Sequence, residues 1–377
     1  MVALVTGRPR VCLVHDYLDQ AGGAERVLAA LAEAFPGAPV FTSIVKPSAL
    51  SPELRKLDIR PSFAQRLPGI LEHKRVFLPV YPMAMESLKL DGYDVILSSS
   101  SAFANGCRVP KGSLHISYCH TPMRVAWRMD DYLANESLPM SAKLAARAVV
   151  GVLRRWDVRA AKKVHRFIAN SSAVRDRIRN YYGRDAEVVY PPVDVDRFAV
   201  RSGEAGNRFL VVSRLVAYKR IDLAVRSCTQ HGLGLDVVGT GPDLNRLRAL
   251  AGTNVTFHGF VPDKDVAVMM RGAKAVIFPG EEDFGIVPVE ANACGCPVVA
   301  FRAGGALDTI VDGVNGVFFD KQGVDDLAVA LKMVDRVPWD PGAMRKRAEA
   351  FNKKRFLDEI RSLVAREWVA WLGTQVV

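Results

Sequence analysis

The sequence lacks several features that would each define a class of protein. None of its apolar runs approaches the roughly 18 residues of a membrane-spanning helix, and no repeat or low-complexity tract occurs in its 377 residues. Its six cysteines show no paired spacing, so reduced thiols fit better than a disulfide framework. Cys294 and Cys296 form a lone C-x-C without further ligand spacing, which disfavours a zinc site.

A secretion signal is also missing from the N-terminal residues MVALVTGRPR, which contain no apolar h-region or cleavage pattern. We therefore expect a cytoplasmic protein. The overall composition is that of a globular protein, with 49% hydrophobic and 24% charged residues. A chain of this length exceeds the size at which one hydrophobic core usually keeps growing, so two domains are expected.

Acidic residues are scarce in one part of the chain only. Residues 1–192 carry 27 Lys and Arg against 17 Asp and Glu, whereas residues 193–354 carry 21 against 20. Residues 355–377 are balanced at 3 against 3, so the formal net charge of +11 belongs almost wholly to the N-terminal half. This asymmetry predicts an anionic partner for that half: nucleic acid, a membrane surface or a phosphorylated substrate.

Short apolar runs alternate with helical patterns along the chain. The runs lie at residues 10–17, 38–45, 93–100, 114–120, 165–171 and 186–191, and again at 209–215, 235–241, 254–260, 275–280, 297–301 and 316–319. This alternation predicts parallel sheets covered by helices on both faces. The polar segment 191–207 is the expected linker, and the tail from about residue 339 is helical. We therefore predict two doubly wound α/β domains in series.

Sheets of this kind bind ligands at the carboxyl ends of their strands, so residues that follow strands are the candidates for chemistry. The strongest such segment begins at Glu281 and places seven residues between Glu282 and Glu290. Between them, Phe284-Gly285-Ile286 lies at an expected helix start, where backbone N–H groups favour an anion. The two carboxylates could then accept hydrogen bonds from sugar hydroxyls. The alternative is that the acidic residues only stabilise the helix N-terminus.

Two cationic residues follow another expected strand. Arg214 stands just past that strand and Lys219 follows five residues later. An arginine fork and a mobile lysine charge could together neutralise a diphosphate. The alternative is that both side chains are simply solvated.

Glycines after two strands give weaker signals. Gly22-Gly23 would allow a phosphate to approach the backbone closely, although a plain tight turn explains the pair more readily. Neither this pair nor Gly239-Thr240-Gly241 completes a G-x-G-x-x-G motif, because Leu244 stands where the latter would need its third glycine. A dinucleotide-dependent oxidoreductase is therefore poorly supported. His120, at a further strand end, is either a buried core residue or a substrate contact.

Taken together, these motifs resemble those of the family 4 retaining glycosyltransferases. The resemblance rests on HDYL…GGAER, YCHTPMR, SRL with lysine five residues after its arginine, the two glutamates and CGCPVVA. It covers nearly the whole chain. It implies the GT-B fold, in which two Rossmann-like domains face each other across a cleft. Residues 1–192 would bind the acceptor and residues 193–354 the nucleotide sugar. The C-terminal helix at 355–377 would cross back to the first domain.

The resemblance also implies a role for each candidate residue. Arg214 and Lys219 would bind the donor diphosphate and stabilise the leaving group. Glu282 would contact the donor sugar, beside the backbone amides of Phe284, Gly285 and Ile286. Glu290 would bind the ribose hydroxyls. Gly22 and Gly23 would let the first domain approach the diphosphate, and His120 would lie beside the transferred sugar. No metal or other cofactor is expected, because two cations and a helix end can stabilise the developing charge.

The resembling branch acts in polysaccharide and lipid-linked oligosaccharide assembly, often with mannose donors. We therefore expect a hexose, with GDP-mannose as the best candidate donor, to be transferred with retention. The expected acceptor is a glycan or a polyprenyl-diphosphate-linked precursor. No residue pattern identifies a nucleophile.

Residues 141–166 concentrate the positive charge, with eight Lys and Arg and one acidic residue. An apolar stripe accompanies this charge at helical spacing: Ala145, Val149, Val152, Trp156, Ala160 and Val164. One interpretation is a helix packed on the sheet with a solvated basic surface. The other is peripheral docking on an anionic membrane or a diphosphate-bearing acceptor, at the inner face of the plasma membrane.

Two other classes of function remain open at this point. One is a sugar-nucleotide epimerase that shares the GT-B architecture, and the other is a polyanion-binding protein without enzymatic activity. A nucleic-acid partner is not expected, because no recognition motif with interleaved aromatic residues supports it.

Overall fold

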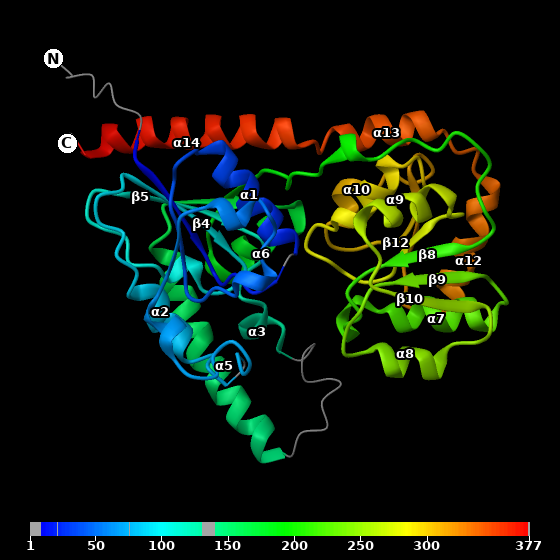
Figure 1. Ribbon diagram of the computed structural model, residues 1–377, viewed down its shortest axis with the longest axis horizontal. Helices are drawn as coiled ribbons and strands as arrows, with labels where there is room; N and C mark the ends of the chain where they lie inside the picture. Colours follow the sequence, from blue (N-terminus) through cyan, green and yellow to red (C-terminus); the bar gives the residue numbers. More distant parts are fainter. Residues whose placement is uncertain (1–8, 21, 75, 130–139, 376–377) are drawn as a thin grey trace. The chain divides into compact units, whose positions relative to one another are not determined.

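The computed structural model describes residues 9–20, 22–74, 76–129 and 140–375, without the side chains of 140–145. Residues 1–8, which make up most of the N-terminal segment that lacks a secretion-signal pattern, lie outside this part. The chain divides into two compact units (Figure 1). Unit 1 comprises residues up to Asn170, Val174–Tyr190 and the chain from Phe356 onward, and unit 2 comprises Ser171–Ala173 and Pro191–Arg355.

Unit 1 is built on a seven-stranded sheet in which every pairing is parallel. The strands are β1 (Val11–His15), β2 (Val40–Thr42), β3 (Ile59–Pro61), β4 (Val95–Ser100), β5 (Leu114–Cys119), β6 (Arg166–Ala169) and β7 (Ala186–Val188). Their order is β3-β2-β1-β4-β5-β6-β7. The chain therefore runs outward from β1 and returns to β4 beside it, which places the topological switch point between β1 and β4.

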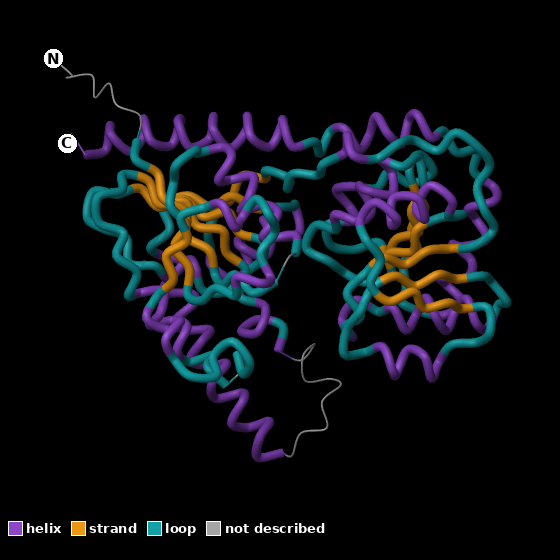
Figure 2. Tube along the Cα trace, in the orientation of Figure 1, coloured by secondary structure: helices purple, strands orange, loops and turns teal. Residues whose placement is uncertain are grey.

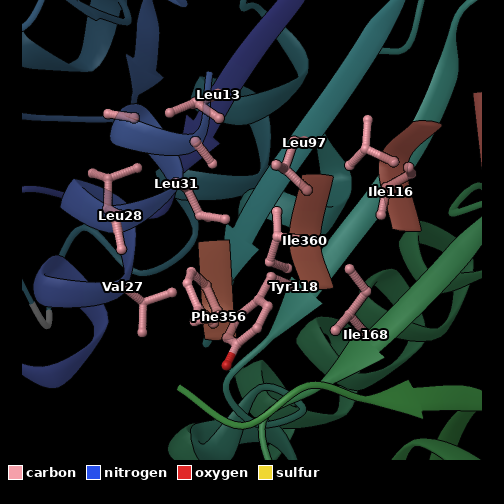
Figure 3. Close-up of a cluster of buried hydrophobic side chains, with 14 of the residues drawn as sticks. Leu13, Val27, Leu28, Leu31, Leu97, Ile116, Tyr118, Ile168, Phe356 and Ile360 are labelled. Atoms are coloured by element: carbon pink, nitrogen blue, oxygen red, sulfur yellow. The ribbon is translucent and has the colours of Figure 1, made fainter. Parts of the chain in front are cut away.

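Helices cover both faces of this sheet. They are α1 (Gly23–Ala34), α2 (Val80–Glu86), α3 (Arg124–Trp127), α5 (Met140–Lys162), α6 (Ser172–Tyr182) and α14 (Lys353–Gln375). Strand side chains alternate between the faces. Leu13, Leu97 and Ile116 are fully or almost fully buried with residues of α1 and α14 (Figure 3). Cys12 and Ile96, one residue away along the same strands, pack with residues of α2 and α5 instead.

The C-terminal helix α14 contributes directly to the core of unit 1. Phe356 and Ile360 are fully buried, and the Phe356 ring packs edge-on against Tyr118 at 5.7 Å between centroids (Figure 3). Leu363 and Val364 continue the same buried stripe. The last helix of the chain thus completes the domain that the first strand begins.

Unit 2 contains a second parallel sheet, of six strands (Figure 2). They are β8 (Phe209–Val212), β9 (Leu235–Val238), β10 (Val255–Gly259), β11 (Val276–Phe278), β12 (Val298–Phe301) and β13 (Gly316–Phe319), in the order β10-β9-β8-β11-β12-β13. The helices are α7 (Ile221–Gln230), α8 (Leu244–Leu250), α9 (Asp263–Gly272), α10 (Ile286–Ala293), α11 (Ala306–Thr309), α12 (Val324–Met333) and α13 (Pro341–Glu349). In Figure 1, α7 and α8 lie on one side of the sheet and α9, α10 and α13 on the other. The prediction of two doubly wound domains is therefore confirmed.

The sequence patterns did not predict strand β3. β3 is a three-residue edge strand of sequence Ile-Arg-Pro, in which Arg60 and Pro61 are exposed and Ile59 is partly buried. So short a run shows no alternation, and proline argues against a strand except at an edge. Its pairing with β2 is fixed by the fold, not by a pattern of its own.

The buried face of α5 also differs from the predicted stripe. Val149 and Val152 are 39% and 59% exposed, whereas Val150 and Leu153 are buried. Trp156 fixes this orientation, because its indole N–H donates to Glu86 at 2.8 Å and its ring lies where any Cβ at Gly106 would be. The predicted stripe was therefore wrong at the two exposed valines, and the side chain of Ala145 lies outside the described part.

Among the helices within the described ranges, none is both long and apolar enough to cross a membrane.

Candidate functional site

In unit 2, the loops after β8 and β11 flank the point where the strand order reverses. β8 is the first strand of this sheet and has β9 on one side and β11 on the other. Ligands of doubly wound sheets bind at such a switch point, outside the carboxyl ends of the strands. The loop at residues 213–220 carries Arg214 and Lys219, and the loop at 279–285 carries Glu282 and Gly285. The topology therefore gathers two motifs that lie about 65 residues apart in sequence.

Glycines allow these loops to pack backbone against backbone. A Cβ at Gly280 would lie 2.8 Å from the Lys219 carbonyl oxygen, and one at Gly304 would lie closer still to the Glu282 carbonyl. Gly305 donates its N–H to that Glu282 carbonyl at 2.9 Å. Side chains at these positions would force the loops apart. Gly280 therefore lets the Glu282 loop approach the Lys219 backbone, and Gly304 and Gly305 let the loop after β12 pack against the Glu282 loop.

Lys219 and Glu282 form an ion pair at the centre of this site. The Lys219 ammonium lies 2.9 Å from one Glu282 oxygen and 3.0 Å from the other. Burial alone would lower the pKa of Lys219, but the Glu282 carboxylate and Tyr218 together outweigh it, and the net pKa is raised. The charge of the exposed Arg214 acts on the Lys219 pKa in the opposite direction, so both cations belong to one electrostatic site. Such a site holds a proton firmly on Lys219 and suits an anionic ligand.

Arg220 adjoins the candidate site, and the sequence patterns did not indicate it. Its φ of +54° puts it in the left-handed region, and it is the sole non-glycine residue of the described ranges to do so. Two side-chain bonds hold it there, to Asp222 at 3.3 Å and to Gln322 at 2.7 Å. This conformation costs about 1–2 kcal/mol for a residue with a Cβ. The strained residue follows Lys219 directly and therefore sets the direction in which the chain leaves the cationic loop.

The N-terminus of α10 provides a second group of donors. Gly285 precedes the helix with a φ of +83°, and Ile286 is its first residue. The first N–H groups of a helix have no acceptor within the helix, and they favour an anion. Phe284 is 3% exposed and its ring packs on Phe351 at 5.6 Å. Its side chain therefore belongs to the core, and its backbone is the part that lies at the site.

Glu290 lies one turn further along α10 and is also ion-paired. Arg197 donates to its Oε1 at 2.6 Å and, through its other terminal nitrogen, to Asp263 at 2.8 Å. The Glu290 side chain is only 9% exposed, so the guanidinium fixes its orientation. Arg197 was missed from the sequence, because a lone arginine in an irregular segment has no spacing signal.

The remaining candidates belong to unit 1. Gly22 precedes α1 in an extended conformation, and its N–H donates to Glu25 at 2.9 Å. Gly23 is exposed and begins the helix. His120, directly after β5, is 8% exposed and bonds through Nε2 to Ser99 at 2.8 Å. Within the described residues, no group of three or more His, Cys, Asp or Glu side chains is placed to hold a metal ion.

A doubly wound domain that gathers two cations and a helix N-terminus at its switch point is typical of proteins that bind nucleotide phosphates. Residues 21–197 match the family described as Glycosyltransferase Family 4, and residues 193–354 match the family described as Glycosyl transferases group 1. The chain therefore belongs to the glycosyltransferases built from these two domains, as its motifs predicted.

Curated relatives match about half of this chain. One is the GDP-mannose-dependent alpha-(1-6)-phosphatidylinositol monomannoside mannosyltransferase of Mycolicibacterium smegmatis, 30% identical over 51% of this chain and 62% of that protein. Another is the D-inositol 3-phosphate glycosyltransferase of Kribbella flavida, 31% identical over 48% of this chain and 51% of that protein. The matches thus span between half and two thirds of these relatives' own length.

Solved structures match over nearly the whole chain. HepE of Anabaena in complex with UDP gives a TM-score of 0.70 at 19% identity and covers 95% of this chain and 100% of that one. Sucrose-phosphate synthase from Thermosynechococcus elongatus gives 0.73 at 19% identity and covers 96% and 100%. At these identities the likeness shows the fold alone, and it confirms the predicted GT-B class.

Proposed function

We propose that this protein transfers a hexose, with retention, from a nucleotide sugar bound in unit 2. The observation that carries the proposal is the Lys219–Glu282 pair beside Arg214 at the switch point of the sheet. A diphosphate would take the place of Glu282 as the counter-charge of Lys219. Glu282 would then be available to the hydroxyls of the donor sugar, beside the backbone at Gly285.

The other candidate residues would bind the ribose, the transferred sugar and the diphosphate. Glu290, held by Arg197, would accept hydrogen bonds from the ribose, and His120 would lie beside the transferred sugar in unit 1. As the sugar leaves, negative charge grows on the diphosphate. Arg214, Lys219 and the α10 N-terminus would stabilise that charge without a metal ion.

GDP-mannose is the donor that we propose, supported by the relatives that use it. A thermal-shift panel of GDP-, UDP-, dTDP- and ADP-sugars tests this choice. Ligand at about 100 times its Kd stabilises a protein by about 2.7 kcal/mol, so we expect GDP-mannose to raise Tm by several degrees and the others to do less. A clear preference for a UDP-sugar would overturn the donor. Conversion of the free sugar nucleotide to an epimer without acceptor would overturn the transferase.

A pair of lysine variants tests the site itself. Lys219→Met removes a charge-assisted bond to the diphosphate, worth about 1.5–3 kcal/mol, and should weaken nucleoside diphosphate binding at least tenfold. Lys274→Met is the matched control. Lys274 is also largely shielded and ion-paired, to Asp335 at 2.8 Å, but it precedes β11 at the opposite end of the sheet. Equal losses of binding, measured by calorimetry, would contradict the site.

For the acceptor, we propose a lipid-linked or polysaccharide-precursor glycan with an anionic diphosphate, reached at the inner face of the plasma membrane. The basic helix α5 of unit 1 supports this choice. A pocket of about 710 Å³ lies against it, lined by Trp127, Val152, Arg154, Arg155, Val158 and Arg159. Its apolar wall and arginines complement a lipid bearing phosphate.

A further inference from the structure

A chain of three buried polar side chains crosses the carboxyl ends of three neighbouring strands in unit 1. His15 is the last residue of β1, Ser99 lies near the end of β4, and His120 directly follows β5. The Ser99 hydroxyl lies 3.1 Å from His15 Nδ1 and 2.8 Å from His120 Nε2. The three side chains are 2%, 1% and 8% exposed. One hydroxyl therefore couples two imidazole rings beside the switch point between β1 and β4.

The surroundings hold this chain rigidly. His15 and Ser99 are register partners in the sheet, and the His120 N–H donates to the Ser100 carbonyl at 2.7 Å. The Tyr118 ring meets the His120 ring at 5.3 Å, in an edge-on arrangement. On the other side, the buried Asp16 carboxylate accepts four backbone and hydroxyl donors from residues 101–104 at 2.6–2.9 Å. The polar groups at this strand edge are thus fixed before any ligand arrives.

Hydrogen-bond chemistry then links the protonation of the two rings. A serine hydroxyl has one proton to donate. If it donates to one neutral imidazole, it must accept an N–H from the other. Ser99 therefore holds the orientation of the His120 ring and couples the position of its proton to that of the His15 ring. A buried polar network of this kind has a large cost if any member is unpaired, so its geometry is strongly determined.

We propose that Ser99, supported by His15, is a positioning residue for His120 in the transfer reaction. This inference rests on the proposed function, in which His120 lies beside the transferred sugar. A reacting group misplaced by about 1 Å can lose roughly 100-fold in rate. Ser99 would act by preventing such misplacement and not by touching the substrate.

The neighbouring serine offers a matched control. Ser98 Oγ also bonds a histidine Nε2, that of His115, at 2.9 Å. Both residues of this pair are fully buried, and His115 is the second residue of β5 and not at its carboxyl end. Ser98→Ala and Ser99→Ala therefore remove the same atom and the same type of hydrogen bond from adjacent residues of one strand.

The experiment compares the full-length variants with GDP-mannose as the donor. For Ser99→Ala we expect kcat to fall about 10- to 100-fold with the donor KM within twofold of the wild type. Ser99→Thr, which keeps the hydroxyl, should recover most of the loss. Ser98→Ala should leave kcat within about threefold. Similar losses of kcat and Tm in the two alanine variants, without rescue by threonine, would overturn the proposal.

A readout independent of activity separates this inference from the proposed function. Long-range ¹H–¹⁵N NMR reports which nitrogen of His120 is protonated. The tautomer of His120 should change in Ser99→Ala and stay as in the wild type in Ser98→Ala. An unchanged tautomer would overturn the positioning role. A wild-type protein that neither binds nor uses any nucleotide sugar would instead overturn the proposed function.

Discussion

At the scale of single residues, Asp157 shows how burial sets the charge of a side chain. It lies in α5, fully buried, and accepts hydrogen bonds from Trp127 and Tyr182, both at 2.7 Å. Burial raises the pKa of Asp157 to about 7, against the opposing effect of those two bonds. Its Oδ1 finds no hydrogen-bond partner in the described part of the chain, an arrangement that suits a neutral acid better than a carboxylate.

This pKa makes stability depend on pH. In the unfolded chain the carboxyl titrates near pH 4, so between about pH 4 and pH 7 only the folded state keeps the proton. Stability is therefore lost as pH rises through this window, by up to about 4 kcal/mol. Asp157→Asn cannot ionise, and its amide oxygen can accept the same two bonds. We expect the variant to gain stability over the wild type between pH 5 and pH 8, measured by urea unfolding.

The difference between variant and wild type at each pH isolates this effect. His115 acts in the opposite direction, because burial lowers its pKa to about 3, but it is present in both proteins. Asp176→Asn on the surface of α6 is the control, since its carboxylate is 56% exposed and, among the described residues, forms an ion pair with its neighbour Arg175 alone. A variant-minus-wild-type difference that is the same at pH 5 and pH 8 would show that Asp157 is ionised throughout.

The sequence indicated some residues of the candidate site and not others, for a physical reason. Lys219 and Glu282 follow strands and stand in motifs, so they were predicted, and the structure pairs them. Ser99, His15 and Arg197 gain their significance from contacts with residues 21 to 93 positions away. No local spacing encodes such contacts. Only the parallel register of β1, β4 and β5 brings the two histidines to one serine.

At the scale of elements, the entry to α10 depends on Gly285. A Cβ at this position would lie 2.6 Å from the ring of Phe278, and the φ of +83° is unfavourable for any other residue. Gly313 has a similar φ of +74° but no atom within 4 Å of its Cβ position. Alanine substitutions at the two positions therefore distinguish the cost of the left-handed backbone, present at both, from the cost of the clash with Phe278, present only at Gly285.

We expect Gly313→Ala to destabilise the protein by about 1 kcal/mol, through the left-handed backbone alone. Gly285→Ala should lose a further 1–3 kcal/mol or so, because Phe278 must move out of a packed position. It should also weaken nucleoside diphosphate binding, since the clash displaces the N-terminus of α10. Urea unfolding and calorimetry measure both effects. Equal destabilisation by the two substitutions would mean that the Phe278 ring yields at little cost.

Elements were more predictable from sequence than their packing faces. All twelve apolar runs that were interpreted as strands contain strands, because a strand buried on both faces leaves a continuous apolar run. The missed strand, β3, is an edge strand of three residues and has no such run. The predicted buried stripe of α5 was wrong at Val149 and Val152, because two overlapping sets of apolar residues both fit a 3.6-residue period. Two tertiary contacts decide which set is buried: the hydrogen bond from Trp156 to Glu86, and the packing of the Trp156 ring against Gly106.

At the scale of the whole molecule, the surplus charge lies in one of the two units. Residues 1–192 hold 27 basic against 17 acidic residues, whereas 193–354 are almost neutral. In unit 2 many of the basic side chains are paired, as Arg208 is with Asp236 and Arg302 with Asp312 and Asp320. On α5, by contrast, the exposed Arg155 and Arg159 form no ion pair with any described residue. The exposed Val152 lies one turn before Arg155 on the same face of the helix.

This distribution predicts that vesicles containing anionic phosphatidylglycerol bind the protein through unit 1. Each basic residue near such a surface contributes about 1 kcal/mol, so Arg155→Glu/Arg159→Glu should weaken binding at least tenfold in a sedimentation assay. Lys332→Glu/Arg336→Glu makes the same change in net charge on exposed positions of unit 2 and should have little effect. Raising the salt concentration should weaken wild-type binding as well, because exposed charges are screened. If the two double variants lose binding equally, the attraction follows net charge alone, and α5 has no particular role at the membrane.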